Sequence, residues 1–254
     1  MKAKTIIQVS NLTAEYGKNV ILKNICFSVK QGEIFIILGG SGCGKSTLLK
    51  HMIGLYTPSS GEIKIHGENL VKAKGYKRKF LMKSFGVMYQ TGALFGSMTL
   101  LENVCLPLEE FTKIPQKGIN QIGLMKLHLV GLSSYADYYP SEISGGMQKR
   151  AAIARAMALD PDILFLDEPS AGLDPITAAE LDHLIVQLSS DLNMTFVIVT
   201  HELASIETIS NRVIMLDKQK KGIIAEGHPK ELKTKSNIPW VRQFFNRKIN
   251  EKQL

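Results

Sequence analysis

Short apolar runs separated by turn residues fill the first part of the chain. Residues 5–12, 20–29, 34–38 and 61–65 are rich in β-branched side chains and are bounded by turn residues. This pattern predicts strands, because branched side chains pack well on a pleated sheet. Residues 46–53 instead have the apolar spacing of a short helix. The first part of the chain is therefore expected to contain a β subdomain.

The pattern becomes helical after residue 90. Apolar residues recur at helical spacing at 99–106, 116–130 and 146–159, which predicts an inserted helical lobe. Beyond residue 162, apolar runs of strand length alternate with helical stretches. The runs are 163–166, 195–199 and 213–216, and the helical stretches are 176–192 and 202–209. Such alternation is typical of a parallel, doubly wound α/β sheet.

The last part of the chain contains two short helical patterns, at 230–234 and 239–248. In the second, four apolar side chains gather on one side of the predicted helix. They are Trp240, Val241, Phe244 and Phe245. We expect this side to be buried, either on the chain's own core or on another protein chain.

Composition is that of an ordinary soluble globular protein, with 254 residues of which 44% are hydrophobic and 21% charged. The sequence has neither an apolar stretch long enough for a membrane helix nor the apolar core of a signal peptide, so we expect a location in the cytosol. Cys26, Cys43 and Cys105 are odd in number and lack paired spacing. They argue against both a disulfide framework and a zinc site.

The net charge of +8 suits nucleic acid, an anionic membrane surface or a nucleotide. A solvated helix face explains its densest cluster most simply, and contact with lipid headgroups or a basic docking surface are the alternatives. Nucleic acid is a minor option, because only Tyr76 and Phe80 accompany these charges. The cluster consists of Lys72, Lys74, Lys77, Arg78, Lys79 and Lys83.

One glycine-rich segment fits the pattern G-x-x-x-x-G-K-[ST] and lies between a predicted strand and a predicted helix. Glycines let the backbone curl so that N–H groups converge on a phosphate, and the helix adds its positive N-terminal end. Lys45 supplies charge for the β- and γ-phosphates, and Ser46 a hydroxyl for Mg²⁺. A plain glycine turn is the alternative. The expected nucleotide-binding residues are Gly39, Gly40, Ser41, Gly42, Cys43, Gly44, Lys45, Ser46 and Thr47.

Cys43 lies inside this segment as a free thiol beside N–H groups that attract anions. A thiol in such a position is expected to be reactive, because nearby positive charge favours the thiolate. We therefore expect a maleimide to block ATP binding, and ATP to protect the thiol.

Two other segments carry chemistry. A buried strand at 163–166 would deliver Asp167 and Glu168 to the C-terminal edge of a sheet, where ligands bind. Asp167 would hold Mg²⁺ through its hydration shell, and Glu168 would act on the attacking water; a solvated acidic turn is the alternative. Ser144-Gly145-Gly146 precedes an alanine-rich helix and leaves its first N–H groups open to an anion, although a simple helix cap has the same form.

Together these segments resemble the nucleotide-binding subunits of ABC transporters, in the family's order from about Thr5 to Gly227. The family signature, usually written L-S-G-G-Q, stands here as Ile143-Ser144-Gly145-Gly146-Met147. Met147 departs from the usual glutamine. We expect activity to survive this departure, because Ser144, Gly145 and Gly146 supply the phosphate contacts.

The resemblance implies an α/β fold, in which a RecA-like P-loop NTPase core carries an antiparallel β subdomain and an inserted α-helical subdomain. It further implies a single ABC ATPase domain at 1–235, followed by a short helical tail at 236–254. Within that domain, the core and β subdomain would occupy 4–90 and 160–230. The helical subdomain with the signature would occupy 91–159.

The resemblance also assigns roles to single residues. Tyr16 matches the aromatic residue that stacks on adenine, and Gln90 matches the glutamine that reaches Mg²⁺ and the water. Asp174 matches the loop that crosses between subunits, and His201 the histidine that touches the γ-phosphate. Each residue also has a purely structural alternative. In the same order, these are a tyrosine in a turn, a solvated glutamine, a helix-capping aspartate and a histidine of the core. The implied catalytic residues are Glu168, His201 and Gln90, and the implied metal ligands are Ser46, Gln90 and Asp167.

Members of the family hydrolyse ATP with Mg²⁺ as a pair of subunits. Two ATP molecules are clamped between the subunits, and each site combines the P-loop of one with the signature of the other. By this resemblance, Ser144 to Met147 meet the γ-phosphate held by a second copy of the chain, and the dimer forms and parts with the ATPase cycle. One copy alone is then not sufficient for hydrolysis.

The segment from Gln90 to Leu108 indicates the subgroup. It lies where the family docks a membrane subunit, and its Thr-Gly-Ala-Leu-Phe stretch and proline-leucine end look like the Mla-type ATPases. Residues 140–147 and 241–245 are similar to that group as well. Mla-type ATPases drive phospholipid transport between the inner and outer membranes of Gram-negative bacteria, with MCE-domain partners.

This resemblance implies integral-membrane permease subunits, an MCE-domain lipid-binding protein and a small STAS-like protein as partners, and no nucleic acid. It places the chain on the cytoplasmic face of the inner membrane. An ATPase for uptake of amino acids or other small solutes is the alternative. A non-transport ABC protein is less expected, because the sequence has neither a second ATPase cassette nor a long coiled-coil insertion.

Overall fold

The structure, a computed structural model, describes residues 4–247. Contacts between Cα atoms divide the chain into two compact units. The first unit holds the chain up to Ala73 and again from Val197 onward, and the second holds Lys74–Phe196. The boundary crosses β8 (Thr195–Val199). The expected helical insertion at 91–159 stays a prediction.

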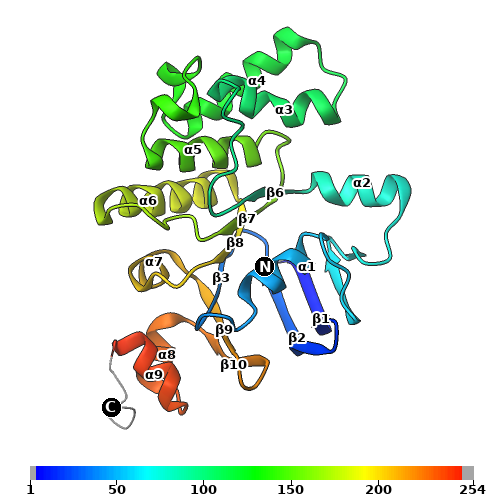
Figure 1. The fold of residues 1–254 in the computed structure, drawn as a ribbon, viewed down its shortest axis with the longest axis vertical. Helices are drawn as coiled ribbons and strands as arrows, with labels where there is room; N and C mark the ends of the chain where they lie inside the picture. The colour runs from blue at the N-terminus through cyan, green and yellow to red at the C-terminus, as the bar shows by residue number, and fades with distance from the viewer. Residues whose placement is uncertain (1–3, 248–254) are drawn as a thin grey trace. The chain divides into compact units, whose positions relative to one another are not determined.

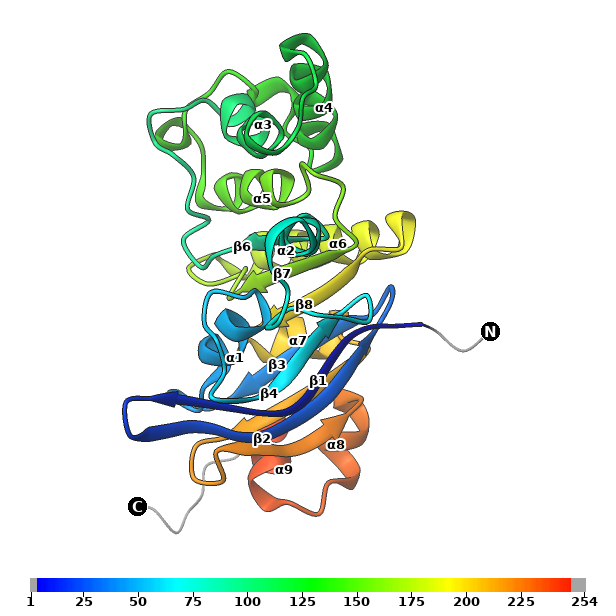
Figure 2. The ribbon, with the colours of Figure 1, turned by 90° about the vertical axis from the view of Figure 1, so that its right-hand side faces the viewer.

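An antiparallel sheet with the strand order β2-β1-β4-β5 lies in the first unit. β1 (Thr5–Tyr16) and β2 (Asn19–Lys30) form a long hairpin, seen in Figure 2. β4 (Ser60–Ile65) pairs with β1, and β5 (Glu68–Asn69) pairs with β4. Buried and exposed positions alternate along much of these strands, as expected where one face covers a core. The expected β subdomain is present.

A second group of strands in this unit has the order β10-β9-β3. β3 (Ile34–Gly39) runs parallel to β9 (Arg212–Asp217), and β10 (Gly222–Gly227) is antiparallel to β9. All six residues of β3 are buried. This agrees with its unbroken apolar sequence, because a strand covered on both faces needs no polar positions.

Among residues 4–247, four helices complete the first unit. They are α1 (Lys45–Met52), α7 (Leu203–Ile209), α8 (Pro229–Lys235) and α9 (Pro239–Asn246). The last two lie side by side, orange to red in Figure 1. In α9, Val241 and Phe245 are fully buried within the chain. The expected extension of this helix to Lys248 falls outside the described residues.

The second unit contains β6 (Phe85–Met88) and β7 (Ile163–Asp167), which pair in parallel with Met88 opposite Leu166. The parallel pairs in both units agree with the expected α/β class. The helices of this unit are α2 (Gly75–Lys83), α3 (Leu100–Phe111), α4 (Gln116–Leu129), α5 (Gly145–Ala156) and α6 (Pro175–Leu192). Two short 3₁₀ turns, Ser133–Tyr135 and Pro140–Glu142, precede α5.

The helices α3, α4 and α5 pack against one another. Gly123 of α4 permits the close approach of α3, because a Cβ there would lie 2.5 Å from the sulfur of Cys105. The sequence predicts the end of α3 at Leu106, but the helix continues through Pro107 to Phe111. A proline in a helix removes one backbone hydrogen bond, and here the apolar packing of Leu108 outweighs that loss. No helix among residues 4–247 is long and apolar enough to span a bilayer.

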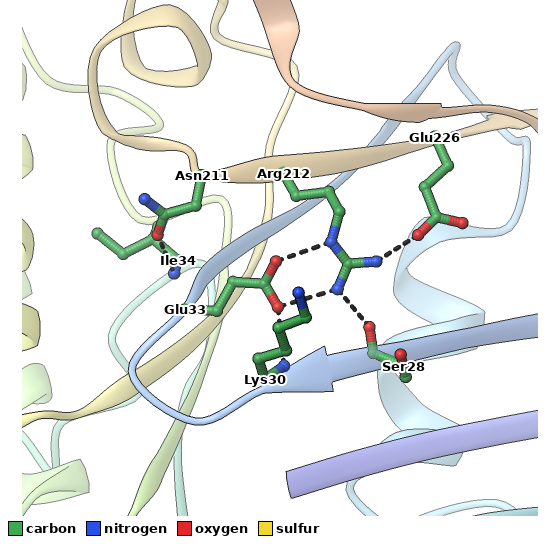
Figure 3. Close-up of polar contacts among 7 residues, drawn as sticks. All are labelled: Ser28, Lys30, Glu33, Ile34, Asn211, Arg212 and Glu226. Carbon is green, nitrogen blue, oxygen red and sulfur yellow. Dashed lines mark hydrogen bonds and ion pairs between the residues drawn. The ribbon is translucent and has the colours of Figure 1, made fainter. Parts of the chain in front are cut away.

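The guanidinium of Arg212 joins several segments of the first unit (Figure 3). Its Nε and Nη2 donate to the two carboxylate oxygens of Glu33 at 2.8 and 2.9 Å. Nη2 also donates to the carbonyl of Ser28 at 2.5 Å, and Nη1 donates to Glu226. The hydrogen bond with Glu33 raises the pKa of Arg212 further. A single side chain at the start of β9 therefore holds β2, β10 and the turn before β3.

We expect Arg212→Met to lower the free energy of unfolding by about 3 kcal/mol, because it leaves the nearly buried carboxylate of Glu33 without its cation. Urea denaturation followed by circular dichroism measures the loss. The matched control is Lys233→Met, which breaks the more exposed ion pair with Glu207 and should cost less than about 1 kcal/mol. Adding Glu33→Gln to Arg212→Met should recover part of the loss. Equal, small effects of Arg212→Met and Lys233→Met would contradict this account.

Candidate functional site

The glycine-rich segment forms a tight loop between β3 and α1 in the first unit. Gly39 has a φ of +151° and lies so close to β9 that a Cβ would be 2.5 Å from the carbonyl oxygen of Leu216. Gly44 has a φ of +102° and is the N-cap of α1, where no side chain caps the helix. The first turn of α1 is thus left for an anion to cap.

Lys45 reaches back over the loop. Its Nζ donates to the carbonyls of Gly39 at 2.9 Å and Gly40 at 3.2 Å. The ammonium group therefore lies beside the same loop whose N–H groups would bind phosphate. Ser46 and Thr47 follow in the first turn of α1. This geometry supports the phosphate cradle predicted from the sequence.

Cys43 corrects one expectation. The side chain is 2% exposed, and its sulfur lies 2.6 Å from where a Cβ at Gly39 would be. Burial raises the pKa of the Cys43 thiol, although Lys45 acts in the opposite direction. Because the thiolate is the reactive form, the structure favours a structural role beneath the loop over the expected reactive thiol.

Tyr16, the expected adenine-stacking residue, ends β1 and is 48% exposed. Its ring meets that of Tyr56 edge-on, with centroids 5.9 Å apart. Tyr56 also contacts the ring of His51 at 5.8 Å, and its carbonyl binds His51 Nδ1. Burial lowers the pKa of His51. The stacking position is therefore connected to α1 by a row of three rings, of which sequence analysis identified only the first.

His201 follows β8 and Thr200 at the C-terminal end of a strand. Its side chain is 59% exposed, with Nε2 4.0 Å from a carboxylate oxygen of Glu202. The backbone N–H of Glu202 binds the hydroxyl of the buried Thr200. The exposure excludes the reading of His201 as a core histidine and leaves its ring accessible to a ligand.

One contact connects the tail of the chain with the phosphate loop. A Cβ at Gly40 would lie 3.8 Å from the indole of Trp240 in α9. Trp240 itself is 37% exposed, while Val241 beside it is buried. Part of the apolar side of α9 thus packs within the chain's own first unit.

The second unit carries the predicted carboxylates at the end of β7. Ile163 to Leu166 are fully buried, Asp167 is half-buried, and Glu168 is 9% exposed. Glu168 has a φ of +47°, a region that residues other than glycine rarely occupy. Such strain is common where a side chain must be aimed precisely. A buried strand therefore does deliver two acids to its C-terminal end, as the sequence predicted.

The signature segment caps α5. Ser144 is the N-cap, and its hydroxyl accepts a hydrogen bond from the N–H of Met147 at 3.3 Å. Gly146 has no room for a side chain, because a Cβ would lie 2.3 Å from the methyl group of Thr177 in α6. Ser144 therefore caps the helix. Gly145 lies on a more open side, because a Cβ there would be 3.7 Å from the side chain of Leu173.

Asp174 caps α6 and accepts hydrogen bonds from the N–H groups of Ile176 and Thr177. It also accepts the hydroxyl of Thr177 at 2.5 Å, and that bond lowers the pKa of Asp174. Thr177 therefore contacts both Asp174 and Gly146. The helix-capping reading of Asp174 holds within this chain, and its expected role between subunits stays a prediction.

Sequence analysis missed the side chains that hold the segment after Gln90. Lys149 of α5 is 7% exposed and donates to the carbonyl of Gln90. Burial lowers the pKa of Lys149, and the charge of Glu168 opposes that effect. Arg155, six residues further along α5, donates to the carbonyls of Gly92 at 2.8 Å and Ala93 at 2.7 Å.

Asn103 of α3, which is fully buried, holds the rest of this segment. Its side-chain amide accepts from the N–H of Phe95 and donates to the carbonyls of Phe95, Met98 and Thr99 at 2.9–3.1 Å. The expected docking segment from Gln90 to Leu108 includes this residue, but the sequence analysis assigned it no role. The segment 90–99, irregular in backbone, is therefore fixed by side chains of α3 and α5.

The predicted site residues are thus distributed over both units. The phosphate loop, Tyr16 and His201 lie in the first; Gln90, the signature, Asp167, Glu168 and Asp174 lie in the second. The hydroxyl, amide and carboxylate oxygens of Ser46, Gln90 and Asp167 are the donor types that Mg²⁺ prefers. Among residues 4–247, no group of three or more His, Cys, Asp or Glu side chains offers an alternative metal site.

Known proteins with similar sequences are ATP-binding transport proteins. The chain is 41% identical over 240 residues to the probable ribonucleotide transport ATP-binding protein mkl of Mycobacterium leprae, covering 94% of this chain and 68% of that protein. It is 41% identical to the intermembrane phospholipid transport system ATP-binding protein MlaF of Haemophilus influenzae, covering 90% and 86%. With MlaF of Escherichia coli K12 it shares 38% identity, covering 95% and 88%.

Solved structures agree in fold. The dimeric ATP-binding cassette MJ0796, bound to ADP and Pi, matches with a TM-score of 0.78 and 29% identity, covering 88% of this chain and 98% of that chain. The cbiO1 protein of Clostridium perfringens, part of the ABC transporter complex cbiONQ, matches with a TM-score of 0.82 and 30% identity, covering 96% and 99%. The family model described as ABC transporter matches residues 22–171. The chain therefore belongs to the ABC transporter family, as one of its ATP-hydrolysing subunits.

Proposed function

We propose that the chain powers phospholipid transport between the inner and outer membranes of a bacterial envelope, by hydrolysing ATP on the cytoplasmic side of the inner membrane. One observation carries this proposal. The likeness to MlaF proteins covers 90–95% of this chain and 86–88% of theirs. The mycobacterial mkl proteins are equally identical, but the chain spans only about two thirds of their length.

The residues of this chain divide the chemistry among themselves. The N–H groups of the loop 39–46 bind the phosphates, and Lys45 exchanges its two carbonyl partners for phosphate oxygens. Glu168 takes a proton from the attacking water, for which its fixed, nearly buried position suits it. His201 contacts the γ-phosphate, and Tyr16 stacks on adenine. Ser46, Gln90 and Asp167 are the ligands we propose for Mg²⁺, which would neutralise phosphate charge when bound.

The active form is a pair of copies. Ser144, Gly145 and Gly146 of one copy complete the phosphate site of the other, because α5 presents an anion-binding N-terminus that the chain's own phosphate loop duplicates. The dimeric state of the similar cassette MJ0796 supports this assembly.

A pocket beside the fixed segment 90–99 is the docking place we propose for the membrane permease. It has a volume of about 630 Å³ and is lined by ten residues, of which Ser97 is the first in the sequence and Asp137 the last. Glu102, Glu109 and Asp137 give it an acidic lining, so a basic side chain of the permease would fit it. An MCE-domain protein and a small STAS-like protein complete the proposed assembly.

Purification of the tagged chain from native membranes, followed by mass spectrometry, tests the transported class. We expect an MCE-domain protein and its permease to copurify. Copurification of a periplasmic solute-binding protein system would contradict the proposal and favour a small-solute importer. The chemistry of the ATPase is the same in both, so only the partners separate them.

Substitution of the proposed base tests the dimer. Glu168→Gln should lower ATP turnover by about a hundredfold or more and accumulate an ATP-bound dimer in size-exclusion chromatography. Lys45→Ala should remain monomeric, because it loses the charge that binds the phosphates. Identical, monomeric behaviour of both variants would count against the composite site.

The contact of Lys149 with Gln90 generates a further prediction. Lys149→Met should lower kcat by about tenfold to a hundredfold and leave KM for ATP nearly unchanged, because it releases the Gln90 segment while the phosphate loop stays intact. Lys149→Arg keeps a donor and should restore most of the rate. Steady-state ATPase assays on the wild type and both variants measure the split. Loss of activity in Lys149→Arg equal to that in Lys149→Met would refute the hydrogen-bond role.

A further inference from the structure

Helix α2, cyan in Figure 1, carries exposed aromatic side chains that ATP hydrolysis does not require. Tyr76 is 85% exposed and Phe80 is 57% exposed. They are four residues apart, so they lie next to each other on one face of the helix. Leu81, on another face, is fully buried and anchors α2 to its unit. Folding of the chain therefore leaves two adjacent aromatic rings in solvent.

Exposed lysines surround these rings. Lys74, Lys77 and Lys79 are exposed, as the two aromatic side chains are. We call Lys74, Tyr76, Lys77, Lys79 and Phe80 the basic–aromatic surface. Between Glu68 and Glu102 the sequence contains six Lys or Arg residues and no Asp or Glu, so this stretch of the chain is strongly basic.

The position of this charge is unfavourable for the helix itself. Lys74 is the N-cap of α2, without a side-chain capping bond, and no acidic residue occupies the first turn. Positive charge at a helix N-terminus opposes the helix dipole, and a short helix is stabilised by acids there. The positive charge is therefore better suited to binding a negatively charged group outside the helix than to stabilising the helix.

A neighbouring contact extends the same surface. Lys83, at the end of α2, donates to the carbonyl of Phe111 at 2.6 Å, and its Nζ lies 5.9 Å from the centroid of that ring. Phe111, at the end of α3, is 54% exposed. A third exposed aromatic ring, again beside a lysine, thus adjoins α2.

Lysines around exposed aromatic rings are the composition of helices that lie in a membrane interface, where rings enter the headgroup layer and ammonium groups meet phosphates. Single-stranded nucleic acid is bound differently, in a basic groove with bases stacked on rings. The surface of a single helix is convex and offers no such groove. We propose that the basic–aromatic surface binds the anionic phospholipid headgroups of a membrane surface, independently of nucleotide.

Vesicle binding by the full-length chain tests this proposal. Vesicles of equal parts phosphatidylglycerol and phosphatidylcholine should sediment with the chain, and vesicles of phosphatidylcholine alone should not. Each lysine near an anionic surface contributes about fivefold in affinity, so the triple variant Lys74→Gln, Lys77→Gln and Lys79→Gln should bind about a hundredfold more weakly. High salt should weaken binding by the wild type, because it screens these charges.

Two further variants separate this surface from net charge. Lys220→Gln, Lys230→Gln and Lys235→Gln together remove the same charge elsewhere on exposed positions and should leave most vesicle binding intact. Tyr76→Ser with Phe80→Ser should reduce binding while keeping every charge. Circular dichroism verifies that each variant is folded. ATP turnover should be unchanged in all three, because α2 is outside the proposed ATPase machinery.

Three outcomes would overturn the proposal. The wild type fails to bind the anionic vesicles, the control triple variant loses as much binding as the α2 variant, or a polyuridine strand binds the surface more tightly than the vesicles. The last would reassign the surface to nucleic acid. None of these outcomes bears on ATP hydrolysis, so this proposal and the proposed function fail separately.

Discussion

The first unit depends on one charged group placed where several strands meet. The guanidinium of Arg212 uses its planar set of donors on Glu33, Glu226 and a backbone carbonyl of β2, and lies 4.9 Å from the ring of Phe35. Phe35 belongs to β3, the strand that ends in the phosphate loop. Arg212 therefore fixes the positions of the hairpin, of β10 and of β3, the strand that ends in the loop. Because the loop itself is rich in glycine, its accuracy has to come from the strands that hold it.

The second unit fixes its own functional segment in a different manner. Residues 90–99 form neither a strand nor a helix; instead, side-chain donors from α5 and α3 bind the backbone carbonyls of this segment. The helix that begins with the signature is thus bonded to the segment that begins with Gln90. Irregular backbone held by side chains is stable only while every donor stays in place.

Local patterns predicted what depends on local geometry. The phosphate loop, the strand ending in Asp167 and the cap at Ser144 each occupy a few consecutive residues, and all three have the expected form. Contacts between distant residues gave no such signal, as with Arg212 and Glu33, 179 positions apart, or Lys149 and Gln90, 59 positions apart. Cys43 shows that local sequence can also mislead. Its neighbours in sequence indicated a reactive thiol, but the folded chain buries this side chain. Pro107 shows that packing overrides a local breaker.

Trp240 is the only tryptophan of the chain, and its indole lies against Gly40 in the phosphate loop. Indole emission shifts with the polarity and mobility of its surroundings. The protein therefore carries an optical reporter at the place where nucleotide is expected to arrive, with no second indole to obscure it. The emission of this one tryptophan can therefore report motion of the loop, docking of the tail and exchange of nucleotide, without any attached dye.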